Sequence, residues 1–141
     1  MKKYLLLLLL PLAIYSCKKD EITAEEQAKI DKEIILKYIK DSSLVVDSTS
    51  SGLYYAISDS GVGATPYDSA FLTVYYKGYL TNGTVFDKNQ TGQPATLFLH
   101  NTIAGWKEGI PKIKKNGRIK LLIPSALGYG TQEVPTLLTT I

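Results

Sequence analysis

Residues 71–87 predict a β-hairpin, and this hairpin limits the possible folds more than any other part of the chain. Side chains of alternate residues from Phe71 to Leu80 fall on one face of an extended backbone, which is typical of a half-buried strand. Asn82 and Gly83 follow, and both residue types tolerate the positive φ angles of a tight hairpin turn. The residues after Gly83 then begin a return strand, so the two strands should pair antiparallel.

The chain holds few residues capable of covalent chemistry, which excludes most enzyme classes. His100 is the only histidine and Cys17 the only cysteine, so a three-histidine metal site cannot form, and a serine triad would depend on His100 alone. We expect His100 to be an ordinary surface residue. The glycines at 61–63 and 128–130 lack the spacing of nucleotide-binding loops. We therefore expect no metal and no cofactor.

The charge balance argues against a nucleic-acid partner. Sixteen Lys and Arg residues stand against thirteen Asp and Glu residues, a net charge of +3, with no basic run interleaved with aromatic residues.

Residues 1–16 predict a lipoprotein signal peptide. Lys2 and Lys3 form a positive start, an apolar run follows, and Ser16 directly precedes Cys17. As a helix, residues 4–15 would be about 18 Å long, shorter than the ~30 Å hydrocarbon core of a bilayer, which favours export over spanning. The small residue before a lone cysteine resembles the lipobox of bacterial lipoproteins, which implies that acyl chains such as palmitate anchor Cys17 to a membrane.

This resemblance implies a location in the cell envelope. The expected site is the outer membrane of a Gram-negative bacterium, with the protein facing the periplasm or the cell surface. An ordinary cleaved signal peptide with an incidental cysteine is the alternative.

A helix should begin after the anchor. Thr23 and Glu26 have the spacing of a capping box. Apolar residues then recur at steps of three and four and predict a buried stripe: Ala28, Ile30, Ile34, Ile35, Tyr38 and Ile39. The residues expected to face water are Lys29, Asp31, Lys32, Glu33 and Lys37. A spacer helix packed on its own domain is favoured over a dimerisation helix, because two heptads are short for a coiled coil. The oligomeric state is left open.

A loop-rich stretch divides this helix from the rest of the chain. Residues 17–50 are therefore assigned to the lipid anchor, spacer helix and linker, and residues 51–141 to the domain.

Three further blocks identify a family. Their sequences are IAGWKEGI at 103–110, GRIKLLIP at 117–124 and ALGYG at 126–130. Together with the hairpin, in this order and with these spacings, they resemble the FKBP-type peptidyl-prolyl cis-trans isomerases from about residue 51 to 130. The resemblance implies an α+β fold, in which a twisted antiparallel sheet wraps around one short helix near residues 106–113, preceded by the signal segment and spacer helix.

The resemblance also implies a substrate pocket. Trp106 would form the floor beneath a substrate proline ring, with Tyr76 and Phe86 as walls, and the Ile103 backbone N–H would donate to a substrate carbonyl. Each residue also has a structural interpretation. Trp106 could fill a core, and Phe86 could be an inward-facing strand residue.

Two further residues would act in catalysis. Asp87 would lie beside the reacting carbonyl, and the Tyr129 hydroxyl would donate to a substrate carbonyl, although Asp87 could instead cap a turn. Rotation about an Xaa-Pro bond breaks no covalent bond, and its ~20 kcal/mol barrier comes from amide resonance. An apolar pocket that favours the twisted form needs to supply only ~5.5 kcal/mol for a ~10⁴-fold acceleration.

The end of the chain departs from the family pattern. After Gly130 the family continues through a loop into a long final strand, whereas only residues 131–141 remain here. We expect roughly one strand to be missing, an unpaired sheet edge and low stability, with residues 137–141 an altered ending.

The implied function is a membrane-anchored isomerase that acts on proline-containing polypeptides and assists the folding of exported proteins. Two alternatives stay open: a non-catalytic chaperone module that holds proline-containing or apolar peptides, and a surface lipoprotein whose FKBP-like domain only docks to a partner.

Overall fold

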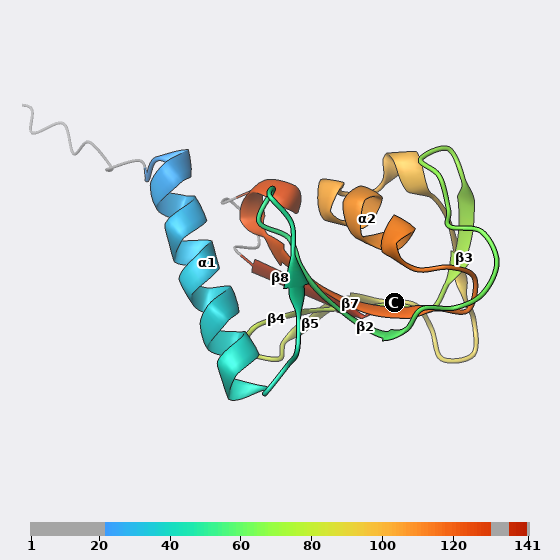
Figure 1. Cartoon of the computed structure of the whole chain (residues 1–141), viewed down its shortest axis with the longest axis horizontal. Helices are drawn as coiled ribbons and strands as arrows, with labels where there is room; N and C mark the ends of the chain where they lie inside the picture. Colours follow the sequence, from blue (N-terminus) through green and yellow to red (C-terminus); the bar gives the residue numbers. More distant parts are fainter. Residues whose placement is uncertain (1–21, 131–135, 141) are drawn as a thin grey trace, which may run out of the picture.

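A computed structural model describes residues 22–130 and 136–140, and its central sheet lies between two helices (Figure 1). The elements in chain order are α1 (Ala24–Asp41), β1 (Asp47–Ser48), β2 (Tyr54–Asp59), β3 (Phe71–Val74), β4 (Lys77–Leu80), β5 (Val85–Lys88), β6 (Ala95–Phe98), η1 (Leu99–Asn101), α2 (Ala104–Gly109), η2 (Ile110–Lys112), β7 (Arg118–Pro124), η3 (Ser125–Leu127) and β8 (Thr136–Thr140). This mixed arrangement confirms the predicted α+β class. The predicted signal segment and Cys17 lie outside the described residues.

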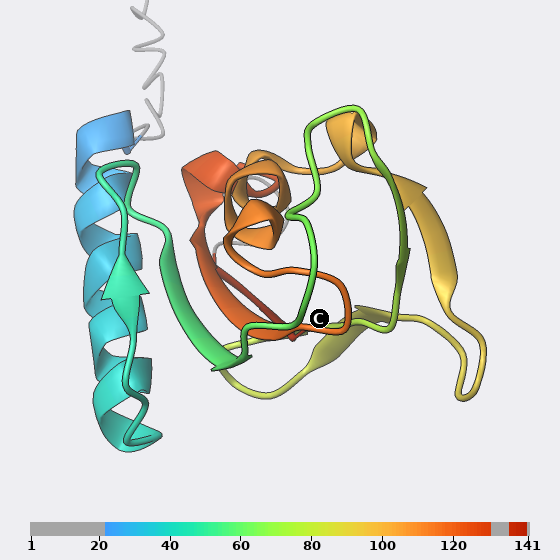
Figure 2. The same ribbon diagram turned by 45° about the vertical axis from the view of Figure 1, so that its right-hand side comes forward.

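The described strands form two antiparallel sheets. The larger has the order β1-β2-β7-β8-β4-β5, and the smaller pairs β3 with β6. Figure 2 shows the small sheet on the side of the molecule away from α1. The two sheets and α2 enclose the core.

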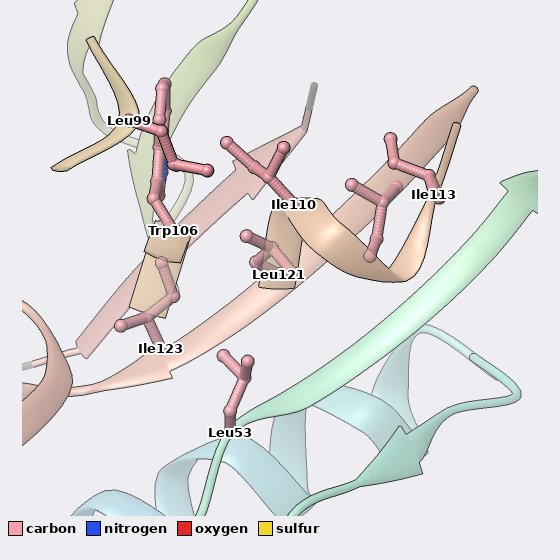
Figure 3. Close-up of a cluster of buried hydrophobic side chains, with 8 residues drawn as sticks. Leu53, Leu99, Trp106, Ile110, Ile113, Leu121 and Ile123 are labelled. Atoms are coloured by element: carbon pink, nitrogen blue, oxygen red, sulfur yellow. The ribbon is translucent and has the colours of Figure 1, made fainter. Parts of the chain in front are cut away.

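Strand β7 organises the core because it is buried on both faces. Its alternate residues Ile119, Leu121 and Ile123 join the main apolar cluster under α2, while Leu122 packs with Ile35 of α1 on the opposite face. The main cluster consists of Leu53, Leu99, Trp106, Ile110, Ile113, Ile119, Leu121 and Ile123 (Figure 3). A continuous run of apolar residues in one strand thus fixes both helices.

The predicted strand at 71–80 is wrong as a single element. It forms β3 and β4, which belong to different sheets. The break falls at Tyr76, whose backbone N–H donates to the Asn89 side-chain oxygen over 2.7 Å rather than to a neighbouring strand. A side chain that takes over a backbone donor interrupts the ladder, so the chain can change sheets there.

The hairpin turn also differs from the prediction. Only Gly83 has a positive φ angle, of 88°. The Gly83 N–H donates to the Leu80 carbonyl over 2.8 Å, and the Leu80 N–H donates to the Thr84 carbonyl over 2.8 Å. The Asn82 side chain accepts from the Thr84 N–H instead of adopting a left-handed backbone. The turn therefore has three residues with glycine in the left-handed position.

The expectation of a missing final strand is wrong for residues 136–140. They form β8, which pairs with β7 on one side and β4 on the other, so no unpaired edge lies between these two strands. The reason is that β4 and β7 offer facing ladder edges, and a segment rich in threonine and leucine can pair with both.

Helix α1 begins with the predicted capping box and packs on its own domain. Thr23 and Glu26 exchange the two expected hydrogen bonds. The helix packs through Ile35, Tyr38 and Ile39, as predicted.

Three residues of α1 lie elsewhere than expected. Ala28 and Ile30 are exposed, while Asp31 is buried rather than in water. Asp31 is buried because it accepts hydrogen bonds from Ser125 on the sheet side of the helix. Within residues 22–130 and 136–140, no helix combines the length and the apolar run that crossing a bilayer needs.

Candidate functional site

The six residues predicted to form a pocket lie around one cavity of about 240 Å³. They come from the β3–β4 break, from β5, from the start of α2 and from the segment after η3. The full lining is Tyr76, Gly78, Phe86, Asp87, Leu97, Asn101, Thr102, Ile103, Trp106 and Tyr129. The chain thus brings together segments that are separated by more than forty residues in sequence.

Trp106 lies deepest in this cavity. Its side chain is 7% exposed, against 37% for Phe86 and 52% for Tyr129, so Trp106 forms the floor and the other two the rim. The Ile103 carbonyl accepts from the backbone N–H groups of Trp106 and Lys107, which starts α2 at the edge of the cavity. The predicted role of the Ile103 amide as a donor to substrate stays a prediction.

A glycine lets this helix approach the sheet. A Cβ atom at Gly105 would lie 2.6 Å from Cγ2 of Ile123 in β7, closer than real Cβ contacts. Gly105 therefore allows α2 to sit directly on β7, and this close packing holds Trp106 at the bottom of the cavity.

Tyr76 contacts both Trp106 at the floor of the cavity and Asp87. Its ring meets the Trp106 ring edge-on, with centroids 5.3 Å apart and an interplanar angle of 81°. Its hydroxyl donates to Oδ2 of Asp87 over 2.8 Å. Burial, together with the hydrogen bond and the charge of Asp87 and a smaller effect of Tyr129, raises the pKa of Tyr76 to about 12. Tyr76 is therefore a neutral donor at physiological pH.

Phe86 lies across a glycine of the neighbouring strand. Gly78 in β4 is opposite Asp87 in β5, and a Cβ atom at Gly78 would lie 2.6 Å from Cζ of Phe86. Only a residue without a side chain lets the ring lie there. Gly78 was not among the predicted site residues, and the signal that could have found it is a glycine inside a strand next to the aromatic-acid pair.

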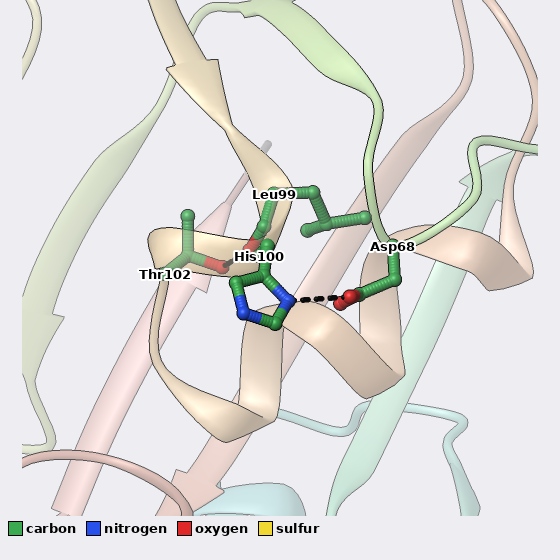
Figure 4. Close-up of polar contacts among 4 residues, drawn as sticks. All are labelled: Asp68, Leu99, His100 and Thr102. Carbon is green, nitrogen blue, oxygen red and sulfur yellow. Dashed lines mark hydrogen bonds and ion pairs between the residues drawn. The ribbon is translucent and has the colours of Figure 1, made fainter.

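Three other lining residues were also missed: Leu97, Asn101 and Thr102. Asn101 and Thr102 directly precede the Ile103 block, which is the one local signal that they carry. The Thr102 hydroxyl donates to the Leu99 carbonyl over 2.7 Å and so closes the turn that leads into α2 (Figure 4).

His100 is an exposed residue that does not line the cavity, as expected. Its Nδ1 lies 2.5 Å from Oδ2 of Asp68 (Figure 4). Residues 22–130 and 136–140 contain no group of three or more His, Cys, Asp or Glu residues able to hold a metal ion. The functional groups on the cavity lining are aromatic rings, the hydroxyls of Tyr76, Tyr129 and Thr102, the Asn101 amide and the Asp87 carboxylate.

Comparison with known proteins relates this arrangement to a family. The family model for the FKBP-type peptidyl-prolyl cis-trans isomerase matches residues 63–139. The FKBP-type peptidyl-prolyl cis-trans isomerase FkpA of Buchnera aphidicola is 48% identical over 100 residues, which cover 69% of this chain and 42% of that protein. FkpA of Escherichia coli K12 is 41% identical over 119 residues, which cover 84% of this chain and 43% of that protein. The chain therefore spans less than half the length of these two relatives.

Solved structures agree with the sequence comparison. The crystal structure of FkpA from Escherichia coli superposes with a TM-score of 0.69 at 36% identity, covering 82% of this chain and 59% of that one. The crystal structure of AtFKBP13 superposes with a TM-score of 0.63 at 26% identity, covering 69% of this chain and 94% of that one. On the family match and the identity to both FkpA proteins, the chain belongs to the FKBP-type peptidyl-prolyl cis-trans isomerase family.

Proposed function

We propose that this chain is a peptidyl-prolyl cis-trans isomerase that acts on proline-containing polypeptides and assists the folding of exported proteins. The observation that carries the proposal is the cavity of about 240 Å³ that has Trp106 as its floor and the Tyr76–Asp87 hydrogen bond in its wall. A proline side chain is a compact apolar ring, and a cavity of this size with an aromatic floor suits it. Family membership supports the same reaction.

The proposed mechanism lowers the rotation barrier without covalent chemistry. A planar amide places partial negative charge on its carbonyl oxygen, and the twisted transition state has lost this charge separation. The aromatic surfaces of Trp106, Phe86 and Tyr76 exclude water and so remove solvation that favours the planar form. The pocket therefore favours the twisted form relative to the planar form.

Asp87 and Tyr129 act on the carbonyl groups of the bound peptide in this proposal. The hydrogen bond from Tyr76 holds the Asp87 carboxylate at the cavity wall, and a negative charge beside the reacting carbonyl disfavours the charge-separated planar form. Tyr129, at the rim, donates a hydrogen bond that holds the peptide while its Xaa-Pro bond rotates.

An isomerisation assay on short Xaa-Pro peptides tests the proposal. Phe86→Ala removes an aromatic ring at the cavity rim worth about 1.5–3 kcal/mol of apolar contact, so kcat/KM should fall roughly 10- to 100-fold. Phe71→Ala is the matched control, because Phe71 is an exposed phenylalanine that does not line the cavity. Equal activity of Phe86→Ala and wild type, or no activity of the folded wild type, would contradict the proposal. Suppression of client aggregation without isomerisation would identify the chaperone alternative instead.

We also propose that Cys17 is acylated and anchors the protein in the cell envelope, with the outer membrane of a Gram-negative bacterium as the membrane. The support is the sequence pattern of a positive start, an apolar run and a small residue before a lone cysteine. Cys17→Ser should move the protein from the membrane to the soluble fraction and abolish incorporation of labelled palmitate. Ser16→Ala, which keeps a small residue before the cysteine, should stay in the membrane. Membrane retention of Cys17→Ser would contradict the anchor.

A further inference from the structure

Asp31 of α1 is a buried carboxylate with a specific set of donors. The residue is 1% exposed. Its Oδ2 accepts from the Ser125 backbone N–H over 2.8 Å and from the Ser125 hydroxyl over 2.5 Å, and its Oδ1 accepts from the Gln27 side chain over 2.8 Å. Burying a carboxylate is costly unless hydrogen bonds replace its water. The contact with Ser125 is therefore a specific link between α1 and the domain.

Ser125 also contacts the segment that carries Tyr129. Its carbonyl accepts from the Gly128 N–H over 3.0 Å and from the Gly130 N–H over 2.9 Å. These glycines are the residues directly before and after Tyr129. The N–H and hydroxyl of Ser125 thus bind it to α1, while the carbonyl of Ser125 fixes the backbone on both sides of Tyr129.

The Tyr129 side chain depends on this backbone for its position. It is 52% exposed at the cavity rim, so packing covers only about half of its surface. Its neighbour Gly130 has a φ angle of 77°, a conformation that the hydrogen bond to the Ser125 carbonyl holds. A shift of Ser125 would therefore move the Tyr129 hydroxyl relative to Trp106.

We infer that Asp31 is a positioning residue for the isomerase site, acting through Ser125 to fix the turn that presents Tyr129 to the cavity. The inference rests on the proposed function for the role of the Tyr129 hydroxyl. None of the residues that line the cavity comes from α1. In this inference α1 still affects the cavity rim through the buried Asp31 carboxylate, so it does more than connect the anchor to the domain.

Kinetics of Asp31→Ala in the full chain test the inference. Displacement of the Tyr129 hydroxyl should lower kcat/KM for Xaa-Pro peptides about tenfold. The assay is run at a temperature where the variant is folded. Asp41→Ala is the matched control, because Asp41 is an exposed aspartate of the same helix that pairs with Lys37. It should keep kcat/KM at the wild-type value.

A double-mutant cycle separates positioning from general destabilisation. If Asp31 acts through Tyr129, Asp31→Ala should lower kcat/KM less than about twofold once Tyr129→Phe has removed the hydroxyl. Asp31→Asn keeps a side-chain oxygen that can accept from Ser125, so it should retain most activity. If Asp31→Ala fails to fold, a tenfold loss of kcat/KM in folded Asp31→Asn would overturn the inference. The same fold loss in both backgrounds would overturn the inference.

A measurement without turnover keeps the inference distinct from the proposed function. Asp31→Ala should change the NMR signals of the Tyr129 ring and speed amide hydrogen exchange at Gly128 and Gly130, whereas Asp41→Ala should not. If wild-type protein lacked isomerase activity but these changes occurred, the proposed function would fail and the positioning of Tyr129 by Asp31 would stand. Unchanged Tyr129 signals in folded Asp31→Ala would overturn the inference.

Discussion

Tyr76 is the residue that joins the apolar and polar parts of the cavity. Its ring packs edge-on against Trp106, its hydroxyl donates to Asp87, and its backbone N–H donates to Asn89. One residue thus marks the break between two strands, forms part of the pocket wall and holds the carboxylate. This concentration of contacts makes the protonation state of Tyr76 relevant to stability.

The pKa of Tyr76 predicts a loss of stability in alkali. The folded protein keeps the Tyr76 proton up to a pKa of about 12, whereas an unfolded tyrosine loses it at about 10. Between these values the folded state binds more protons, so the free energy of unfolding should fall as pH rises from about 10 to 12. Below pH 10 this contribution is fully present. Denaturant unfolding across this range measures the fall.

Tyr76→Phe is the control for this pH effect. The variant lacks the hydroxyl, so its free energy of unfolding should fall less steeply between pH 10 and 12, while the other tyrosines affect both proteins alike. Parallel pH profiles of wild type and Tyr76→Phe would contradict the assignment of the raised pKa to this residue.

At the scale of elements, local sequence patterns predicted where a helix or strand begins better than they predicted which distant segments it contacts. The capping box at Thr23 follows from neighbouring residues, and the structure confirms it. The family resemblance implied one short helix near 106–113, and the structure places it slightly earlier, as α2 at Ala104–Gly109 followed by η2 at Ile110–Lys112. Burial of Asp31 depends on Ser125, 94 residues away, so no local period could reveal it. The split of 71–80 into two strands similarly depends on Asn89, a residue beyond the hairpin.

The contact between α2 and β7 predicts a strong response to one methyl group. A Cβ atom at Gly109 would lie 2.4 Å from Cδ2 of Leu121, which is fully buried. Gly109→Ala should therefore lower the free energy of unfolding by about 1–2 kcal/mol, because overpacking outweighs the better helix propensity of alanine. Lys107→Ala, an exposed change in the same helix, should have little effect.

A second substitution should relieve this overpacking. Leu121→Ala alone should cost about 2–5 kcal/mol by leaving a cavity. Adding Gly109→Ala should then cost nothing or restore part of the loss, because the new methyl group enters that cavity. Additive losses in the double variant, measured by denaturant unfolding, would show that Gly109 and Leu121 do not contact each other.

At the scale of the whole molecule, β8 connects two parts of the large sheet. Strands β1, β2 and β7 lie on one side of it and β4 and β5 on the other. The backbone of Leu138 faces Tyr79 on one side and Leu122 on the other. Strands β4 and β7 do not pair with each other, and β8 alone joins them in the sheet.

Proline in this strand should unfold the domain. Leu138→Pro removes a backbone donor from a strand paired on both sides and should lower the free energy of unfolding by at least ~3 kcal/mol. Ser48→Pro is the matched control, because β1 pairs only with β2 at the edge of the sheet. Circular dichroism and denaturant midpoints distinguish the two, and a wild-type midpoint for Leu138→Pro would contradict the central position of β8.

The sequence predicted the residues of the candidate site better than it predicted the pairing of the strands around it. Six lining residues follow from motifs in family order. Gly78, Asn101 and Thr102 lie in or beside those motifs but were missed, and Leu97 lines the cavity through packing alone. The pairing of β8 was missed because residues 136–140 carry little pattern of their own, and their strand forms on edges supplied by β4 and β7.

The central place of β8 has a consequence for biosynthesis. As ribosomes deliver the chain from its N-terminus, β4 and β7 emerge without their shared neighbour, and the sheet can close only after residues 136–140 have left the exit tunnel. Until then β4 and β7 cannot be joined in one sheet. A polypeptide that stays open this long can be threaded through a secretion channel, as its predicted leader would require.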